Sequence, residues 1–433
     1  MIGMNTECWQ RFAWRLFAAV IGCVYSLAGT AAVGMPIGFA TLNGGTTGGG
    51  NGPTVTATTA VEFQNFVEQS GPLNIEVAGT LNVGNVEIES DKTIVGIGST
   101  GGLVGNIKID GVSNVIIQNL SISNPSGGGT GDTIEVSEST NVWIDHNDIF
   151  NSTDGLLDIV RESDFVTVSW NKFFYTPDFA QNVNTGHRFA MLIGNGDGAV
   201  QDADNLRVTL HHNHWGENVR ERMPRVRFGD VHVFNDYFNT PGNNYAIRAA
   251  IGSELLVENN SFENVNNPFE KFFTTGANPL IEASGNLFVN SGGTTDAGDN
   301  VFNPPYAYTL DSAQNVKDLV LGGAGVGFTP VLAGDYNENG VVDAADYTVW
   351  RDRLGQPAGS LPNDVDGGII GMDQYTTWKT NFGNTGSGSS AAKNLVSVPE
   401  PAALLLLAAG IGLLLRVRRR AASVCPCPLP PVP

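Results

Sequence analysis

From Leu73 onward, short runs rich in β-branched residues are separated by Gly, Asn and Asp, which predicts many short strands. Six runs share one polar position, and they lie at 141–149, 165–173, 207–215, 231–238, 255–262 and 281–288. The shared position is occupied by Asn147, Asn171, Asn213, Asp236, Asn260 and Asn286, at intervals of 24, 42, 23, 24 and 26 residues. A period in the low twenties indicates a solenoid, and we expect an all-β, right-handed parallel β-helix. A β-sandwich is the alternative, although its repeats would keep register less well.

Three local features refine this repeat. The shared polar positions are expected to form a ladder of side chains inside one turn of the coil. Residues 58–70 carry apolar residues at 61, 63, 66 and 67, which predicts a short helix that covers the open apolar end. The 42-residue interval holds one coil plus about 18 extra residues between Lys172 and Asn195, and such insertions usually carry function.

A smaller helical unit is expected at 331–385, where 335–355 and 363–383 repeat in step at 28 residues. The first copy has the spacing of a calcium loop followed by a helix, with Gly340 at its sixth position. Its expected ligands are Asp335, Asn337, Asn339, Val341, Asp343 and Asp346. An Asx-rich turn is the alternative, and the second copy lacks most ligands. The unit resembles a type I dockerin, which implies a cohesin-like protein partner.

Both ends of the chain have the composition of targeting segments. Residues 1–33 predict a secretory signal peptide, with a lipoprotein site at Cys23 as the less favoured alternative. A linker at 386–397 leads to 398–420, where Pro-Glu-Pro precedes an apolar run and an arginine cluster. A plain membrane anchor is one interpretation. The order resembles a PEP-type sorting tail, which implies an exosortase-type processing enzyme, only transient membrane contact, and a secreted or cell-surface protein. A Pro-rich tail follows at 421–433.

Composition narrows the possible functions. The 433 residues include 23 Lys and Arg against 43 Asp and Glu, and a net charge of −20 argues against nucleic-acid binding. A hydrophobic content of 41% argues against general disorder, and 54 glycines fit a protein with many turns. The four cysteines lie near the termini, so the folded body is expected to hold no disulfide and no thiolate metal site.

A basic cluster stands out against this acidic background. Four arginines fall within eight residues, and three further basic residues lie in or beside the insertion. The four are Arg220, Arg222, Arg225 and Arg227, and the three are Lys172, His187 and Arg188. An ion-pair network would explain only some of them, because few acids are close in sequence. Arginine binds carboxylates bidentately, so the cluster predicts a site for a polyanion.

Carboxylates recur in the same sector of the coil. Counted back from the ladder, Asp132, Asp154 and Asp158 fall 15, 17 and 13 residues before their ladder positions, and Arg222 falls 14 before its own. Adjacent coils lie about 4.8 Å apart, so the carboxylates should converge and Arg222 should lie about 10 Å away. Three converging carboxylates suit Ca²⁺. Gly155 is expected to bend the strand between Asp154 and Asp158.

This arrangement predicts a reaction on one acidic sugar held between the ion and the arginine. The ion neutralises the uronate carboxylate and stabilises the enediolate that forms when the C5 proton is removed. Loss of the C4 glycosidic oxygen then completes a β-elimination that needs no water nucleophile. The ordinary pKa of arginine exceeds about 12, so an arginine base predicts an alkaline optimum.

Six segments resemble motifs of the pectate lyases of polysaccharide lyase family 1. They are 38–50 (GFATLNGGTTGGG), 142–146 (VWIDH), 154–159 (DGLLDI), 166–171 (VTVSWN), 191–194 (MLIG) and 222–229 (RMPRVRFG). The resemblance covers the expected lyase domain at 34–330 and implies cleavage of α-1,4-linked polygalacturonate to 4,5-unsaturated products. The implied roles are calcium binding by Asp132, Asp154 and Asp158, proton abstraction by Arg222, and substrate binding by Arg227 and its neighbours. Asp145 and His146 of VWIDH are expected to form a structural polar pair.

Two positions depart from the family pattern. Thr130 stands where many members have a further calcium-binding carboxylate, and Phe189 stands where the family usually has a substrate-binding lysine. Arg188 is expected to replace that lysine, with Lys172 a weaker candidate; otherwise the substrate shifts toward methylated pectin or another uronan. Two other functions remain open: a non-catalytic surface β-helix that binds glycans or mediates adhesion, and a hydrolase on the same fold.

Overall fold

The structure is a computed structural model that describes residues 35–183, 186–327, 333–357, 359–364, 366 and 368–383. The predicted signal peptide, linker, sorting tail and Pro-rich tail, at 1–33, 386–397, 398–420 and 421–433, lie outside the described residues. In the described part of the chain, no helix combines the length and apolar character that crossing a membrane requires.

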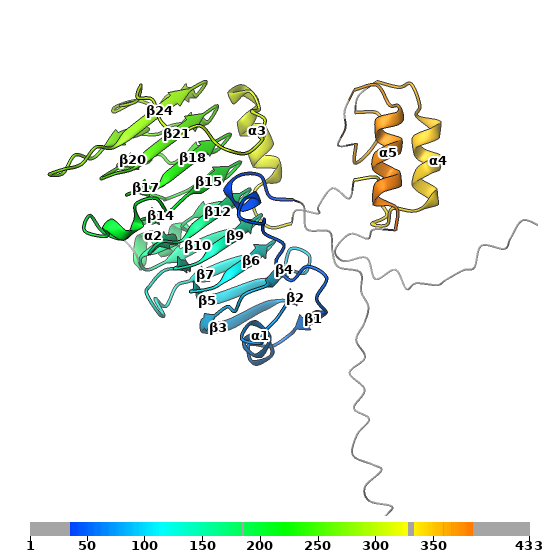
Figure 1. The fold of residues 1–433 in the computed structure, drawn as a ribbon, viewed down its shortest axis with the longest axis horizontal. Helices are drawn as coiled ribbons and strands as arrows, with labels where there is room; N and C mark the ends of the chain where they lie inside the picture. The colour runs from blue at the N-terminus through cyan, green and yellow to red at the C-terminus, as the bar shows by residue number, and fades with distance from the viewer. Residues whose placement is uncertain are drawn as a thin grey trace, which may run out of the picture. The chain divides into compact units, whose positions relative to one another are not determined.

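The first body is a parallel β-solenoid with three strand faces (Figure 1). Face 1 is a 10-stranded sheet in which every neighbouring pair is parallel. Its strands are β1 (Thr54–Ala57), β2 (Leu73–Val77), β4 (Lys92–Gly96), β6 (Ser113–Gln118), β9 (Thr140–Asp145), β12 (Asp164–Ser169), β15 (Val208–His211), β18 (Asp230–Phe234), β21 (Glu254–Glu258) and β24 (Leu280–Ser284). This pairing confirms the predicted solenoid and excludes the sandwich.

Faces 2 and 3 belong to one 15-stranded sheet, because the long strand β5 pairs with both β8 and β7. Face 2 contains β3 (Thr80–Glu87), β5 (Gly102–Asp110), β8 (Ile134–Ser137), β11 (Gly155–Val160), β14 (Phe189–Ile193), β17 (Arg225–Val226), β20 (Ile247–Ala249) and β23 (Phe269–Lys271). Face 3 contains β7 (Ser121–Asn124), β10 (Asp148–Ser152), β13 (Lys172–Phe174), β16 (His214–Trp215), β19 (Tyr237–Asn239), β22 (Ser261–Glu263) and β25 (Leu287–Val289).

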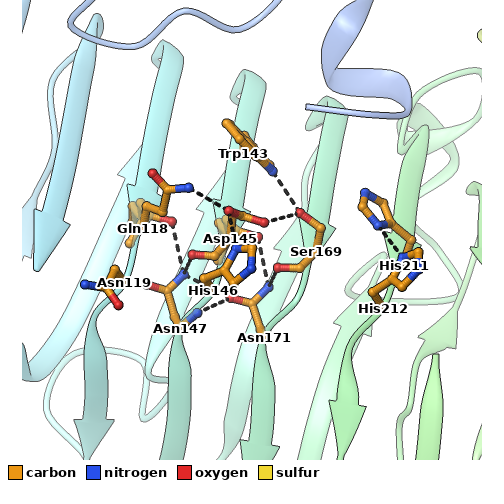
Figure 2. Close-up of polar contacts among 12 residues, drawn as sticks. Gln118, Asn119, Trp143, Asp145, His146, Asn147, Ser169, Asn171, His211 and His212 are labelled. Atoms are coloured by element: carbon orange, nitrogen blue, oxygen red, sulfur yellow. Dashed lines mark hydrogen bonds and ion pairs between the residues drawn. The ribbon is translucent and has the colours of Figure 1, made fainter. Parts of the chain in front are cut away.

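The predicted polar ladder joins successive coils between faces 1 and 3 (Figure 2). The N–H of Asn147 donates to Oδ1 of Asn171 at 3.0 Å, and the N–H of Asn171 donates to Oδ1 of Asn213 at 3.0 Å. The same pattern continues through Asp236 and Asn260 to the last coil. Each rung pairs buried backbone groups that the turn would otherwise leave without partners, so the ladder fixes the register of the coils.

Helices of the chain cover the first end of the solenoid and parts of two of its faces. Helix α1 (Ala60–Val67) starts with a capping box between Thr59 and Glu62, and it buries Phe63 and Val67 on the first coils, as predicted. A short helix, η1 (Phe39–Thr41), crosses face 1 near the N-terminus, and helix α3 (Ala313–Gly323) packs on face 3. The insertion contains α2 (Pro177–Asn182) and β14, and η2 (Val200–Asp202) follows it.

The second body is a pair of short helices, α4 (Ala344–Asp352) and α5 (Met372–Asn381). Its small core consists of Tyr336, Trp350, Leu361 and Ile370, with four aliphatic and aromatic neighbours packed against it. Each helix therefore lies inside one of the two sequence repeats, and each begins where the loop at the start of its repeat ends.

Candidate active site

Two carboxylates meet at the start of β11 on face 2. Oδ1 of Asp132 accepts the N–H of Gly155 at 2.8 Å, and Oδ1 of Asp158 accepts the N–H of Leu192 at 3.1 Å. A Cβ atom on Gly155 would lie 2.9 Å from Oδ1 of Asp132 and 2.6 Å from Oδ1 of Asp158. Both oxygens therefore lie against the position that a side chain at residue 155 would occupy.

The electrostatics of this pair show that the two acids disfavour full ionisation. Burial raises the pKa of Asp132 to about 6, a hydrogen bond from Thr130 opposes the shift, and the charge of Asp154 adds to it. Burial, followed by the charge of Asp132, raises the pKa of Asp158 well above its ordinary value, and Arg222 opposes this shift. A bound cation would offset the repulsion, and carboxylate oxygens are the donors that a hard ion such as Ca²⁺ prefers.

The acidic site differs from the prediction in two respects. In the described residues, no three His, Cys, Asp or Glu side chains form a group that could hold a metal ion. Asp132 and Asp158 come together, whereas Asp154 precedes β11 and acts on them through its charge. Gly155 does not bend the chain at this point, because it belongs to β11; its role is to leave room for the two carboxylate oxygens.

Arg222 reaches this region across an aromatic ring. Its guanidinium carbon lies 3.8 Å from the centre of the Phe189 ring, and Phe189 is in register with Gly155 on β11. A cation held over a ring face gains about 0.5–2 kcal/mol, so the ring supports the guanidinium. Below them, the hydroxyl oxygen of Tyr175 lies 2.8 Å from the carbonyl oxygen of Phe189 and 3.2 Å from that of Asp154. Tyr175 thereby joins two coils under the site.

The arginines of the solenoid divide into two groups. Arg161, Arg207, Arg227 and Arg248 each form an ion pair with an acidic side chain. Among the described residues, no acidic side chain lies within ion-pair distance of Arg188, Arg220, Arg222 or Arg225. Moreover, the Nε atoms of Arg188, Arg220 and Arg225 are buried without a hydrogen-bond partner. In a chain with a net charge of −20, this group has the character of a site for external carboxylates.

The other predicted substrate residues occupy different surroundings. Arg227 donates to Oδ1 of Asp197 at 2.6 Å and to the carbonyl oxygen of Gly194 at 3.0 Å, so its guanidinium is engaged inside the protein. His187 is exposed and stacks on Phe189 with ring centres 5.0 Å apart, which places it beside the site.

Lys172 does not reach the site. It lies on β13 of face 3, in register with Asp148 and His214, and its ammonium nitrogen lies 4.7 Å from the centre of the Phe174 ring. Proximity to the insertion in sequence does not decide on which of the three faces a residue lies, and the place of Lys172 on face 3 does not support the predicted substrate contact.

Glu135 is a site residue that the sequence analysis missed. It lies on β8 in register with Asp158, and only 4% of it is exposed. Its Oε1 accepts from Arg161 at 2.9 Å, whereas its Oε2 is buried without a hydrogen-bond partner. Its position 23 residues before Asp158, one repeat of the solenoid, is the signal that could have identified it.

The VWIDH motif has a structural role on face 1, as predicted (Figure 2). The Nδ1 atom of His146 lies 2.6 Å from Oδ2 of Asp145, and the hydroxyl of Ser169 donates to Oδ1 of Asp145 at 2.6 Å. Trp143 donates from Nε1 to the Ser169 hydroxyl at 2.9 Å. Serine and histidine thus both bind the same buried carboxylate, which stabilises the coil instead of activating a nucleophile.

The predicted calcium loop of the helical body is closed by its own side chains. Asp335 accepts the N–H groups of Asn339 and Gly340 at 3.1 and 2.7 Å. Asp346 accepts those of Asn337 and Asp343 at 3.0 and 2.8 Å. These bonds are typical of the Asx-rich turn that was the alternative interpretation. Calcium binding by this loop stays a prediction.

Comparisons with known proteins agree with the fold. The family described as Pectate lyase matches residues 14–329. A pectate trisaccharide-lyase of Bacillus licheniformis is 38% identical over 310 residues, which cover 67% of this chain and 86% of the relative. Pectate lyase A of Aspergillus niger is 35% identical over 299 residues, covering 66% of this chain and 86% of that relative.

Among solved structures, a pectate lyase from Bacillus sp. N165 in complex with trigalacturonate is similar, with 32% sequence identity and a TM-score of 0.60. The match covers 67% of this chain and 99% of that structure. The enzyme class is therefore that of a polysaccharide lyase, and the non-catalytic alternative is not supported. This chain belongs to the pectate lyase family.

Proposed function

We propose that this protein is a calcium-dependent pectate lyase that cleaves α-1,4-linked polygalacturonate by β-elimination. The observation that carries the proposal is that face 2 brings together two carboxylates that repel each other and a group of arginines that, among the described residues, have no acidic partner. A polyuronate is an acidic polymer, so its carboxylates complement both halves of this arrangement.

Asp132 and Asp158, with Asp154 beside them, would hold the calcium ion, which supplies positive charge against the uronate carboxylate when it is bound. Thr130 supports Asp132 by a hydrogen bond in place of the additional family carboxylate. Because the pKa of Asp132 is raised to about 6, this carboxylate is half protonated at that pH, and calcium is expected to bind more tightly as the pH rises above it.

Arg222 acts as the base in this proposal. In its neutral form it accepts the C5 proton, the C5–H electron pair becomes the C4–C5 double bond, and the C4–O bond breaks with its electrons on the leaving sugar. The ring of Phe189 fixes the guanidinium in place. Arg225 and Arg188 bind substrate carboxylates. Arg227 donates to Asp197 and thereby stabilises the chain next to β17.

The test is an assay on polygalacturonate with calcium and with a chelator. A lyase produces an unsaturated uronate with ultraviolet absorbance, whereas a hydrolase produces reducing ends without that absorbance and a binding protein produces neither. We expect absorbing product with calcium and at least a tenfold loss with chelator. Reducing ends without absorbance, or full activity under chelation, would reject the proposal.

We further propose that the helical body is a dockerin-like calcium module and that the chain is secreted or displayed at the cell surface after processing by an exosortase-type enzyme. The loop spacing from Asp335 to Asp346 and the order of segments at 398–420 support these two proposals. Calcium titration of an Asp335→Ala variant tests the first. The mass of the protein recovered outside the cell tests the second.

A further inference from the structure

Two arginines beside the proposed base form an isolated pair of like charges. Arg188 lies just before β14 and Arg220 lies on the next coil, where its N–H donates to the carbonyl oxygen of Arg188 at 2.9 Å. Burial, followed by the charge of Arg220, lowers the pKa of Arg188. The backbone contact places the two residues side by side on adjacent coils, and the effect of one charge on the other is consistent with it.

The donors of this pair are only partly used. Nη2 of Arg220 donates to Oδ1 of Asn244 at 3.1 Å, but the Nε atoms of both arginines are buried and have no hydrogen-bond partner among the residues that the structure describes. The nearest acid in sequence, Glu221, accepts instead from Nδ2 of Asn244 at 2.5 Å. The side-chain amide of Asn244 therefore orients Arg220 through its oxygen and binds Glu221 through its nitrogen. In the described residues, Glu221 forms no ion pair with either arginine.

A purely structural role does not account for this arrangement. Burying a charged donor without a partner costs free energy, and two adjacent like charges add to that cost. Arg161, Arg207 and Arg227 avoid this cost by pairing with acids. A carboxylate from outside would fill the open donors and separate the two charges, and its planar shape matches the guanidinium fork.

We propose that Arg188 and Arg220 together bind one uronate carboxylate, at a second carboxylate position next to Arg222 that needs no calcium ion. This inference rests on the proposed lyase function and adds a requirement to it. The sugar at this position must carry a free acid, because a methyl ester cannot accept the same charge-assisted hydrogen bonds. Asn244 is a positioning residue for this pair.

Kinetics of Arg188→Gln, Arg220→Gln and the double variant test the proposal, with Arg351→Gln on α4 as the charge-matched control. On polygalacturonate, we expect each single variant to raise KM about tenfold with kcat within about twofold, because a charged hydrogen bond is lost in binding. Since both arginines hold one carboxylate, the double variant should raise KM by less than the product of the single effects. On highly esterified pectin, KM should change less than about twofold. Equal losses on both substrates, or an unchanged KM on polygalacturonate, would overturn the proposal.

Calorimetric titration of trigalacturonate in the presence of chelator separates this proposal from the lyase assignment. The parent and the Arg351→Gln control should bind it, and the double variant should bind at least about tenfold more weakly. An Asn244→Ala variant should show part of this loss. If no substrate yields unsaturated product, the lyase assignment fails, yet the titration still decides the binding site. Equal binding by parent and double variant would refute the site. Thermal unfolding checks that each variant is folded.

Discussion

At the scale of single residues, Gly155 and Phe189 have roles that depend on their contacts across coils. Gly155 leaves the space toward which the oxygens of Asp132 and Asp158 point. Phe189 offers its ring to Arg222 at the position where the family pattern led us to expect a lysine. Neither side chain has a role in the proposed chemistry itself, and each contacts groups to which the proposal gives such a role.

Gly155→Ala should weaken calcium binding. The new Cβ would lie 2.6 Å from Oδ1 of Asp158, so the two carboxylates must move apart. We expect at least a tenfold rise in the calcium dissociation constant, measured by calorimetry, with the fold retained. Gly196→Ala, where a Cβ meets no atom within 4 Å, is the matched control. If Gly155→Ala bound calcium as tightly as the control, the site would be misplaced.

Phe189→Leu should lower kcat more than it changes KM. Leucine fills much of the volume of the ring but offers no π face to Arg222, whose guanidinium carbon lies 3.8 Å from the ring centre. Loss of about 1 kcal/mol of cation–π support corresponds to roughly a fivefold fall in kcat. Phe189→Tyr, which keeps the π face, should retain most of the activity. A leucine variant with the kcat of the parent would show that the ring does not position Arg222.

At the scale of structural elements, the polar ladder determines which residues share a sector of the coil. It could be predicted from sequence because Asn147, Asn171 and Asn213 repeat at nearly the period of the coil and their bonds run from one coil to the next. The same count placed Asp132 and Asp158 together. This count could not place Lys172, because the face on which it lies depends on where the turns of the coil fall. Nor could it predict the ion pair of Arg227 with Asp197, which depends on how the insertion folds back.

The ladder should contribute more to stability at its centre than at its end. Asn171→Ala removes the acceptor of Asn147 and leaves buried backbone groups without partners, with an expected cost of about 2–4 kcal/mol in the free energy of unfolding. Asn286→Ala changes the last and partly exposed rung and should cost less than half as much. Denaturant unfolding of both variants measures the difference. Equal costs would mean that the ladder does not hold the coils in register.

At the scale of the whole molecule, face 2 of the solenoid carries acidic groups on some coils and arginines on the coils that follow. Burial raises the pKa of Asp132 to about 6 near the middle of face 2, and arginines without acidic partners lie on the following coils. The fold, the repeat and the chemical class could be predicted from sequence. The open donors of Arg188 and Arg220 could not, because they depend on which hydrogen-bonding groups of the described residues stay unfilled after folding.

Calcium should stabilise the protein more at alkaline than at acidic pH. The folded-state pKa of Asp132 is raised to about 6 above an unfolded value near 4, so without metal its contribution to stability improves as pH falls from about 7 to 4. Calcium requires the ionised form, so the rise in Tm on adding calcium should be larger near pH 8 than near pH 5. Asp132→Asn, which leaves the predicted calcium loop of the helical body intact, should lose most of this pH dependence. A calcium effect on Tm that is the same at both pH values would contradict the assignment.

The most direct measurement of the central claim compares Arg222→Ala with Asp158→Asn in two assays, formation of unsaturated product from polygalacturonate and calorimetric binding of calcium. We predict that Arg222→Ala binds calcium like the parent and loses at least about a hundredfold in kcat, because a base is removed from an intact metal site. Asp158→Asn should lose calcium affinity and activity together. An Arg222→Ala variant that keeps the activity of the parent, or an Asp158→Asn variant that keeps its calcium affinity, would contradict the account.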